Sequence, residues 1–339
     1  MNENKDAGYR VRGLRHERCG VPAEVLDLAQ LDVPAPGPGE ALVALRVAAI
    51  HYSDLGMING TYGRARTLPA IAGREGVGEV VAVGADTVGL RIGDLVRMPE
   101  NAGAWREAVV AKADEFFPIP PGVPVEQAAQ AFINPPTAWR LLYDFVPLQP
   151  GDWLIQNAGT SAVGIVVAQL ARHFGWRVVS VVRDVAATAR LQVAGAAAVV
   201  AEDSGYEKDP GALTGGAPLK LALNGIGGES AGRLCRAVAP GGVVVTYGGI
   251  TSDPMRFPTR YLIFNDIVLR GFWMDLWART HSREQLEVFW RQMLELLQAG
   301  VIEQPVATRY PLAEWRTAIE LAFRGGRAGK VLFTSAWRP

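Results

Sequence analysis

The second half of the chain alternates short apolar strands with helices, and this alternation limits the fold more than any other feature of the sequence. Residues 152–158, 176–183, 219–227 and 241–249 have the composition of buried strands. Between the first two, residues 162–175 repeat valine and leucine at helical spacing. Strands that alternate with helices of about 10–15 residues indicate βαβ units around a parallel sheet.

The chain up to about Pro121 follows a different pattern. It is rich in glycine and proline, and residues 40–50 and 76–84 form short β-branched runs. Residues 90–98 predict a further strand with a turn inside it, so this region is typical of an antiparallel β domain. Residues 325–333 predict a strand that returns to the same domain, which makes the strand–helix region an insertion.

Composition excludes several classes of protein. The 34 basic and 34 acidic residues balance, whereas a nucleic-acid-binding protein normally carries a basic excess. The two cysteines, Cys19 and Cys235, cannot form a thiolate zinc cluster, and we expect both to be reduced. No uncharged apolar run approaches the roughly 18–20 residues of a membrane span.

The first twenty residues predict no targeting segment. They contain no apolar stretch of the signal-peptide kind, and Glu3, Asp6 and Glu17 interrupt their arginines, which argues against a transit peptide. The sequence therefore predicts a cytoplasmic protein that binds neither nucleic acid nor membrane.

Residues 157–164 (NAGTSAVG) follow one strand and open the next helix, which is where a dinucleotide pyrophosphate binds backbone N–H groups. Ala158, Ser161 and Gly164 occupy the three positions that are usually glycine. Small residues still allow the backbone to approach a phosphate, although they also serve ordinary strand–helix packing. The position of the turn in a βαβ series favours the cofactor site.

The following strand ends at Arg183, 19 residues after Gly164. An NAD enzyme places a carboxylate near this point to bind the ribose 2′-hydroxyl, whereas an arginine can pair with a 2′-phosphate. Asp184 comes one position later and also suits a turn or a helix cap. The arrangement favours NADPH as the cofactor.

Seven stretches together resemble the medium-chain dehydrogenase/reductase superfamily over essentially the whole chain, and within it the mitochondrial-type trans-2-enoyl-thioester reductases. They are NGTYG (59–63), PPTAWRLL (135–142), GDWLIQNAGTSAVG (151–164), SVVRD (180–184), LALNGIGG (221–228), VTYGG (245–249) and LIFNDIVLRGFWMDLW (262–277). The resemblance implies an α/β chain in which a GroES-like antiparallel β barrel accompanies a Rossmann domain with a doubly wound parallel sheet. It places the GroES-like domain at residues 1–131 and 276–339 and the NADP(H)-binding domain at 132–275, with nicotinamide in a cleft between them.

The same resemblance implies site residues. Tyr62 matches the catalytic tyrosine, Trp273 an aromatic residue near nicotinamide, and Asn134 a residue that could orient the nicotinamide ribose or the substrate. Each has a plainer alternative, namely loop packing for Tyr62, core packing for Trp273 and helix capping for Asn134. The implied cofactor-binding set is Thr160, Ser161, Ala162, Val163, Gly164, Arg183, Tyr247, Gly248, Gly249, Phe272, Trp273 and Lys330, the last of which could equally be a surface lysine.

The chain departs from its resemblance at the positions where zinc-containing relatives bind metal. These positions hold His51, Arg74 and Asn134, and a guanidinium is never a zinc ligand. A metal site from His51, Asp54 and Glu75 remains an alternative, but we expect no metal because of the Arg74 charge. The enoyl reductase branch usually has Asn-Pro where this chain has His51 and Tyr52, and Gly-Asn-Glu where it has Gly-Arg-Glu.

The resemblance implies NADPH-dependent reduction of an activated carbon–carbon double bond, with hydride added to the β-carbon of a trans-2-enoyl thioester of CoA or an acyl carrier. Reduction of quinones or small enones is the first alternative, because NGTYG is shared with quinone oxidoreductases. A non-enzymatic NADPH-binding protein of the same fold is the second. The apolar strand at residues 267–274 suggests a homodimer in which this edge is buried.

Overall fold

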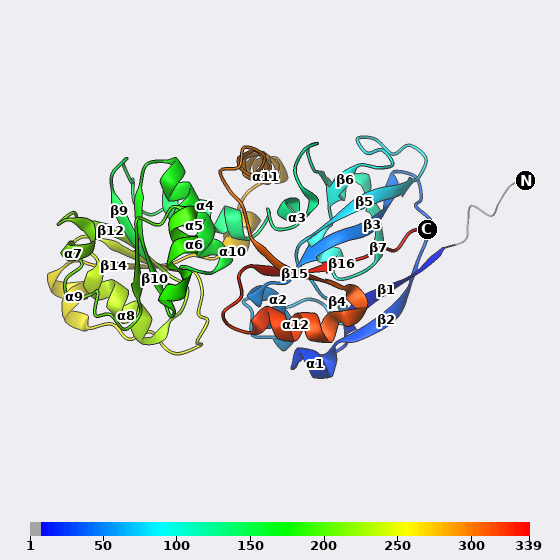
Figure 1. The fold of residues 1–339 in the computed structure, drawn as a ribbon. Helices are drawn as coiled ribbons and strands as arrows, with labels where there is room; N and C mark the ends of the chain where they lie inside the picture. The colour runs from blue at the N-terminus through cyan, green and yellow to red at the C-terminus, as the bar shows by residue number, and fades with distance from the viewer. Residues whose placement is uncertain (1–7) are drawn as a thin grey trace, which may run out of the picture. The chain divides into compact units, whose positions relative to one another are not determined.

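The computed structural model describes residues 8–339, which form two compact units (Figure 1). Among the described residues, unit 1 comprises 8–132 and 304–339, and unit 2 comprises Ile133–Glu303. Glu3 and Asp6, which the sequence analysis used against a transit peptide, lie outside the described residues. Within residues 8–339, no helix combines the length and the apolar character needed to cross a membrane.

The elements of unit 1 are β1 (Tyr9–His16), α1 (Pro22–Val25), β2 (Asp27–Val33), β3 (Glu40–Ala49), α2 (Tyr52–Asn59), β4 (Ala70–Ile71), β5 (Gly76–Val83), β6 (Leu95–Arg97), η1 (Glu100–Ala102), β7 (Ala108–Lys112), η2 (Ala113–Glu115), β8 (Phe117–Pro118), α3 (Val125–Ala128), β15 (Val306–Pro311), η4 (Leu312–Glu314), α12 (Trp315–Phe323) and β16 (Lys330–Thr334). Seven strands form one sheet in the order β15-β16-β3-β5-β6-β8, with β7 also paired to β3, and β2-β1-β4 form a smaller sheet. Most of these pairs are antiparallel, as predicted.

The last strand of the chain completes the sheet of unit 1. β16 pairs antiparallel with β3, opposing Leu332 to Ala49, and parallel with β15. The predicted return of the C-terminus to the first domain is therefore confirmed.

The strand predicted at residues 90–98 is shorter than expected, because a turn takes up its first half. Arg91 N donates to the Asp94 carboxylate at 2.7 Å, and Gly93 adopts a φ of 95°. Only residues 95–97 remain in the ladder as β6.

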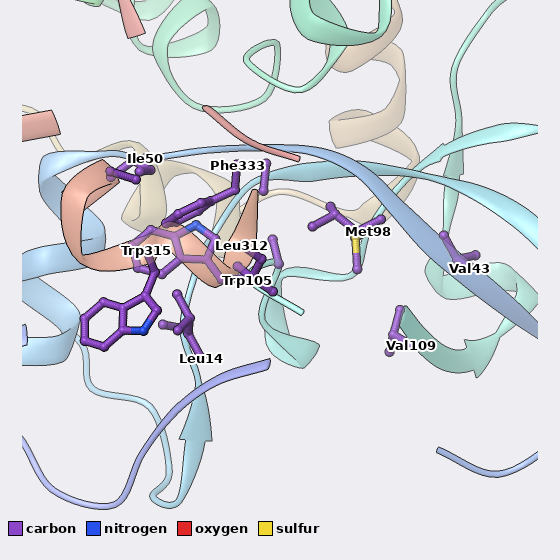
Figure 2. Packing of buried hydrophobic residues seen from close by; sticks show 14 of the residues in the cluster. Leu14, Val43, Ile50, Met98, Trp105, Val109, Leu312, Trp315 and Phe333 are labelled. Carbon is purple, nitrogen blue, oxygen red and sulfur yellow. The ribbon is translucent and has the colours of Figure 1, made fainter. Parts of the chain in front are cut away.

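An aromatic pair anchors the core of unit 1 (Figure 2). Trp105 and Phe333 are fully buried and meet edge to face, with ring centroids 5.2 Å apart. The Trp105 indole N–H donates to the Ala49 carbonyl at 3.2 Å, so its one polar atom is satisfied. Leu14 and Met98, both buried, belong to the same cluster, which joins the first strand of the chain to the last.

The elements of unit 2 are α4 (Asn134–Tyr143), β9 (Trp153–Gln156), α5 (Ala162–His173), β10 (Arg177–Val182), η3 (Val185–Ala187), α6 (Thr188–Ala194), β11 (Ala198–Ala201), α7 (Gly211–Thr214), β12 (Leu219–Asn224), α8 (Gly228–Ala237), β13 (Val243–Thr246), α9 (Thr259–Phe264), β14 (Val268–Gly271), α10 (Met274–Arg279) and α11 (Arg283–Gln298). Six parallel strands form its sheet in the order β11-β10-β9-β12-β13-β14. The order reverses between β9 and β12, and such a switch point is where open parallel sheets bind ligands.

The second boundary between the units falls later than the predicted 275/276. Helix α11 packs against α4 and buries Phe289, Met293, Leu294 and Leu297, so it belongs to unit 2. The chain therefore returns to unit 1 at Gln304.

Pro135 and Pro136 lie at the start of a helix, where proline is tolerated. Both prolines lie in the first turn of α4, which starts at Asn134. A proline in the first turn loses no helical hydrogen bond, because the N–H groups of that turn have no partner within the helix.

Candidate active site

Tyr62 lies in the loop that follows helix α2 in unit 1. The backbone N–H groups of Thr61 and Tyr62 both donate to the Gly56 carbonyl, at 2.8 and 3.0 Å. A side chain at Gly56 would meet the Tyr62 Cβ at 3.2 Å, so the glycine lets the tyrosine pack directly on the helix. These contacts fix the start of the side chain, which is half-buried.

The Tyr62 hydroxyl accepts a hydrogen bond from a buried arginine. Arg74 Nη1 lies 3.0 Å from Tyr62 Oη, and Arg74 Nε donates to Glu100 Oε1 at 3.0 Å. The guanidinium carbon also lies 5.2 Å from the centroid of the tyrosine ring. In the sequence Arg74 stands where zinc-containing relatives bind metal, and its contact with Tyr62 was not predicted.

A row of three polar side chains lies inside unit 1 close to Arg74. It consists of Lys330, His51 and Glu75. Lys330 Nζ lies 3.0 Å from His51 Nδ1 and donates to the Ile50 carbonyl, also at 3.0 Å. His51 Nε2 lies 2.7 Å from Glu75 Oε2, and Glu75 Oε1 accepts from the Phe132 N–H. Because an ammonium group can only donate, Nδ1 is the acceptor and the His51 proton sits on Nε2.

Burial controls the charges in this row of side chains. It lowers the pKa of His51 well below its usual value, and Lys330 and Arg74 act in the same direction, so the imidazole is neutral. Burial also raises the pKa of Glu75 to about 8 and lowers the pKa of Lys330 to about 8. Lys330 was predicted to bind cofactor, and in the structure its ammonium contacts these groups of unit 1.

The predicted pyrophosphate turn connects β9 to α5 in unit 2. Ser161 caps the helix, its hydroxyl accepting from the Gly164 N–H at 3.1 Å. A Cβ at Gly164 would lie 2.7 Å from the carbonyl oxygens of Ala158 and Gly159, so only glycine fits there. Ala158 adopts a φ of 51°, the left-handed conformation that glycine usually supplies. The turn therefore keeps the backbone path of a glycine-rich loop with a degenerate sequence.

The other predicted cofactor residues of unit 2 follow the carboxyl ends of its strands. Parallel strands present these ends at one edge of the sheet. Arg183 is exposed after β10, and the Asp184 carboxylate caps η3 by accepting from the Ala186 N–H at 2.9 Å, which is the capping alternative named above. The residues along this edge are Thr160, Ser161, Ala162, Val163, Gly164, Arg183, Tyr247, Gly248, Gly249, Phe272 and Trp273.

Tyr247 and Trp273 are both half-buried. Burial raises the pKa of Tyr247 to about 12, and the neighbouring Ser161 hydroxyl acts in the opposite direction. Trp273 is the N-cap residue of α10, and its ring lies under the Arg279 guanidinium, 4.9 Å from the guanidinium carbon. Tyr247 therefore stays protonated and reaches the turn that would hold phosphate.

Two buried asparagines at the switch point were missed by the sequence analysis. Asn157 follows β9 and donates to Asn224 Oδ1 at 2.7 Å and to Ser230 Oγ at 2.9 Å, while its own oxygen accepts from the Gly225 N–H. Asn224 ends β12 and also accepts from the N–H groups of Ile226 and Gly227. A polar residue at the end of each of two apolar strands was the signal that could have revealed the pair.

Asn134 begins α4 and does not cap it, because the cap position belongs to Ile133. Its side chain is buried, and within residues 8–339 its amide nitrogen has no hydrogen-bond partner. An unpaired buried amide donor is costly, and a bound polar group would satisfy it. Of the predicted site residues, Tyr62 and Lys330 thus belong to unit 1, and Asn134 belongs with the others to unit 2.

A parallel sheet with a reversal of strand order and a phosphate-type turn, in a chain that also has a largely antiparallel unit, is the arrangement of a medium-chain dehydrogenase/reductase. Two family models match the chain, the zinc-binding dehydrogenase model over residues 162–295 and the alcohol dehydrogenase GroES-like domain over residues 37–121. The human mitochondrial enoyl-[acyl-carrier-protein] reductase is 38% identical over 332 residues, which cover 96% of this chain and 89% of the human one. The chain belongs to the family of these enoyl reductases.

Two solved structures are similar over nearly the whole chain. An Etr1p mutant in complex with NADP and crotonyl-CoA superimposes with a TM-score of 0.87 at 27% identity, covering 96% of this chain and 100% of the other. A putative NADPH:quinone reductase from Bacillus thuringiensis gives 0.87 at 29% identity, covering 96% and 99%. The predicted fold class, a GroES-like domain with an antiparallel sheet and a Rossmann domain with a parallel sheet, is confirmed.

The prediction of a cytoplasmic location is wrong. The human, bovine and frog relatives, at 38%, 38% and 36% identity, are all mitochondrial enzymes, and they point to mitochondria rather than the cytoplasm. The prediction used charge and hydropathy near residue 1. These features concern a possible targeting segment only, and they carry no information on where related enzymes work.

Proposed function

We propose that this chain reduces the carbon–carbon double bond of a trans-2-enoyl thioester of CoA or an acyl carrier, with NADPH as the hydride donor. The observation that carries the proposal is the Tyr62 hydroxyl, which contacts the Arg74 guanidinium at 3.0 Å. Its support from relatives is the similarity to enoyl-[acyl-carrier-protein] reductases and to the Etr1p complex with NADP and crotonyl-CoA.

The residues of unit 2 fit an NADPH molecule. The Gly164 position has no room for a side chain, and the exposed Arg183 follows β10, where a 2′-phosphate would bind. The side-chain amide nitrogen of buried Asn134 has no hydrogen-bond partner in the described part of the chain and could donate to a polar group such as the nicotinamide ribose. When bound, NADPH supplies a hydride to the β-carbon of the substrate.

Unit 1 supplies the acid. Hydride addition moves the electron pair of the double bond toward the thioester carbonyl, so negative charge develops on oxygen and the α-carbon must take a proton. A phenol stays protonated near neutral pH and can donate to that charge or to that carbon. We assign this role to Tyr62, with Asn134 and Trp273 orienting nicotinamide and substrate.

We also propose that the enzyme works without zinc. His51 already contacts Lys330 and Glu75 through its two ring nitrogens, and Arg74 adds a second positive charge near the former metal position. A divalent cation would have to displace these contacts and overcome both charges. Elemental analysis of the purified protein tests this, and one zinc per chain would contradict it.

We further propose a homodimer formed through the β14 edge of unit 2. Val268 on this strand is 41% exposed, and Ile263 and Phe264 on the preceding helix α9 are 67% and 77% exposed. Exposed apolar edges of this kind are rarely left uncovered in soluble proteins.

Quinone reduction is the second candidate, favoured by the similarity to the Bacillus thuringiensis protein. Parallel assays of NADPH oxidation with crotonyl-CoA, with a quinone and without substrate separate the two. Turnover of crotonyl-CoA no faster than the blank, beside fast quinone turnover, would reverse our choice.

Replacing Tyr62 with phenylalanine tests the role of the hydroxyl. Losing one preorganised donor typically costs about 100- to 1,000-fold in turnover, so Tyr62→Phe is expected to lower kcat for crotonyl-CoA by that factor while NADPH affinity stays the same. Quinone turnover should fall less, because water can protonate reduced quinone oxygens. Tyr52→Phe is the matched control, since Tyr52 is exposed and packs on Phe323. Near-normal kcat in Tyr62→Phe would remove Tyr62 from the mechanism.

A further inference from the structure

The position of Arg74 depends on the backbone immediately before it. Gly73 adopts a φ of 89°, and a Cβ at this position would overlap the ring of buried Trp105. The Gly73 carbonyl accepts from Arg66 Nη2 at 2.7 Å. The guanidinium of Arg74 therefore starts from a fixed turn, and its side chain is only 3% exposed.

The Arg74 guanidinium, which donates to Tyr62 through Nη1, is also bound by the Glu100 carboxylate. This carboxylate receives the Arg74 Nε bond, pairs with Arg64, and lies 3.9 Å from Arg97 Nη2. Burial alone would raise the pKa of Glu100, but Arg74, Arg64 and Arg97 together lower it below its usual value. Glu100 is therefore ionised, and a single carboxylate faces three guanidinium groups.

The charged groups that surround the Tyr62–Arg74 pair come from several elements of unit 1. They are Asp54, Arg64, Arg66, Glu75, Arg97, Glu100 and Lys330. Four of the seven are basic and three are acidic, and burial raises the pKa of Asp54 and Glu75, which favours their neutral forms. With the Arg74 guanidinium added, positive charge exceeds negative charge around the phenol oxygen. Such an excess lowers the free energy of an oxyanion more than that of a neutral phenol.

We propose that Arg74 is a positioning residue of the reaction, which orients the Tyr62 hydroxyl and stabilises the phenolate that remains after its proton has left. The inference rests on the proposed function. It goes beyond the family resemblance, which implies an uncharged asparagine where this chain has Arg74.

The chemistry balances as follows. As the hydride adds to the β-carbon, the double-bond electron pair becomes available at the α-carbon of the enolate. The Tyr62 O–H bond breaks, its proton forms the new C–H bond at the α-carbon, and its electron pair stays on the phenol oxygen beside Arg74. Water then returns a proton to the phenolate, so the net reaction consumes one hydride and one proton.

A double-mutant cycle in turnover tests whether Arg74 acts through Tyr62. Arg74→Gln should lower kcat for crotonyl-CoA by about 10- to 100-fold, the range for losing a charged hydrogen bond, with little change in NADPH affinity. Arg74→Lys should recover part of the loss. Combining Arg74→Gln with Tyr62→Phe should be no slower than Tyr62→Phe alone. Losses that multiply in the double variant would overturn the inference.

A second measurement needs no turnover. In cofactor-free protein labelled with ¹³C at tyrosine Cζ, the signal absent from Tyr62→Phe reports ionisation of this phenol. Its titration midpoint should move to higher pH in Arg74→Gln and return toward the parent in Arg74→Lys. Arg12→Gln is the control, because it breaks another arginine–carboxylate pair of unit 1, that with Glu107. An unchanged midpoint in folded Arg74→Gln would also overturn the inference.

The two experiments separate this inference from the function on which it rests. If Tyr62→Phe keeps normal kcat, the catalytic role of Tyr62 fails whatever Arg74 does. If Tyr62→Phe is slow but Arg74→Gln is normal in both kcat and titration, the function stands and the role of Arg74 fails.

Discussion

Arg183 and Asp184, which follow β10, have different surroundings. The Asp184 carboxylate is used in the η3 cap, where it accepts from the Ala186 N–H. Arg183 is exposed beside it and within residues 8–339 makes no ion pair. A carboxylate that caps a helix is poorly placed to bind the 2′-hydroxyl of NAD, so we propose that Arg183 governs cofactor choice.

Replacing Arg183 with alanine should weaken NADPH binding by roughly 1.5–3 kcal/mol, the usual cost of a lost charged hydrogen bond. NADH has no 2′-phosphate, so its affinity should barely change. Fluorescence titration with both nucleotides measures the difference. Arg177→Ala provides the control at the start of the same strand, where Arg177 packs on Trp153. Equal losses for both nucleotides would leave Arg183 with a structural role only.

Individual site residues differ in how well a sequence can predict them. Tyr62 is carried by a contiguous motif, so local sequence was enough to nominate it. Arg74 lies 12 residues from Tyr62 and 26 from Glu100 along the chain. The contacts of Arg74 with Tyr62 and Glu100 depend on the left-handed backbone at Gly73 and on the close packing of Trp105 against this glycine. Neither feature can be recognised from a local sequence pattern.

Helix α2 links the row of polar side chains in unit 1 to the tyrosine loop. At its start, the Asp54 carboxylate accepts from the His51 N–H at 2.7 Å, and near its end the Gly56 carbonyl holds Tyr62. Asp54 is only 1% exposed, and this burial raises its pKa to about 6. The folded chain therefore retains a proton that the unfolded chain releases near the ordinary aspartate pKa.

This raised pKa predicts a pH dependence of stability. The protonated Asp54 favours the fold at low pH, and that contribution is lost as the pH rises from the ordinary aspartate value of about 4 through about 6. Asp54→Asn cannot titrate but keeps a cap acceptor, so its free energy of unfolding relative to the parent should rise across this window. A difference of about two units between the folded and unfolded pKa of Asp54 limits this change in the free energy of unfolding to at most about 3 kcal/mol.

Urea unfolding at several pH values between 4 and 7 measures the effect. Asp32→Asn is the control, since Asp32 is highly exposed in the same unit. Parallel stability curves for the parent and Asp54→Asn would show that the buried carboxyl does not titrate in this range.

Apolar periodicity predicted the strands and helices of unit 2 well. It could not predict features that depend on backbone conformation, such as prolines at the start of a helix or a residue with a positive φ. The strands and helices from β9 to β14 follow from apolar spacing, which is clearest in the central strands β9, β10 and β12 because they are buried along nearly their whole length. Pro135 and Pro136 begin α4, and apolar spacing alone cannot predict this, because periodicity does not distinguish the first turn of a helix from an interior turn. The conformation of Ala158 was also beyond prediction, because alanine rarely adopts a positive φ.

The assembly of the enzyme should depend on the edge of unit 2. If β14 and α9 form the dimer contact, Phe264→Lys places a charge in an apolar interface and should shift the protein toward monomer in light scattering. Val193→Lys is a closely matched control, because Val193 on α6 and Phe264 are both 77% exposed. A dimer that persists in Phe264→Lys at low micromolar concentration, or a monomeric parent, would contradict the proposed interface.

The return of the chain at Gln304 has a consequence for its synthesis. Val47, Ala48 and Ala49 of β3 pair with β16, which is translated after the whole of unit 2, so these residues lack their strand partners during most of synthesis. Unit 2 is continuous in sequence and is complete before those partners emerge, and domains generally fold as units during translation. A nascent chain therefore has its parallel sheet before the sheet of unit 1 is complete, and it can bind NADPH before the rest of the enzyme has folded.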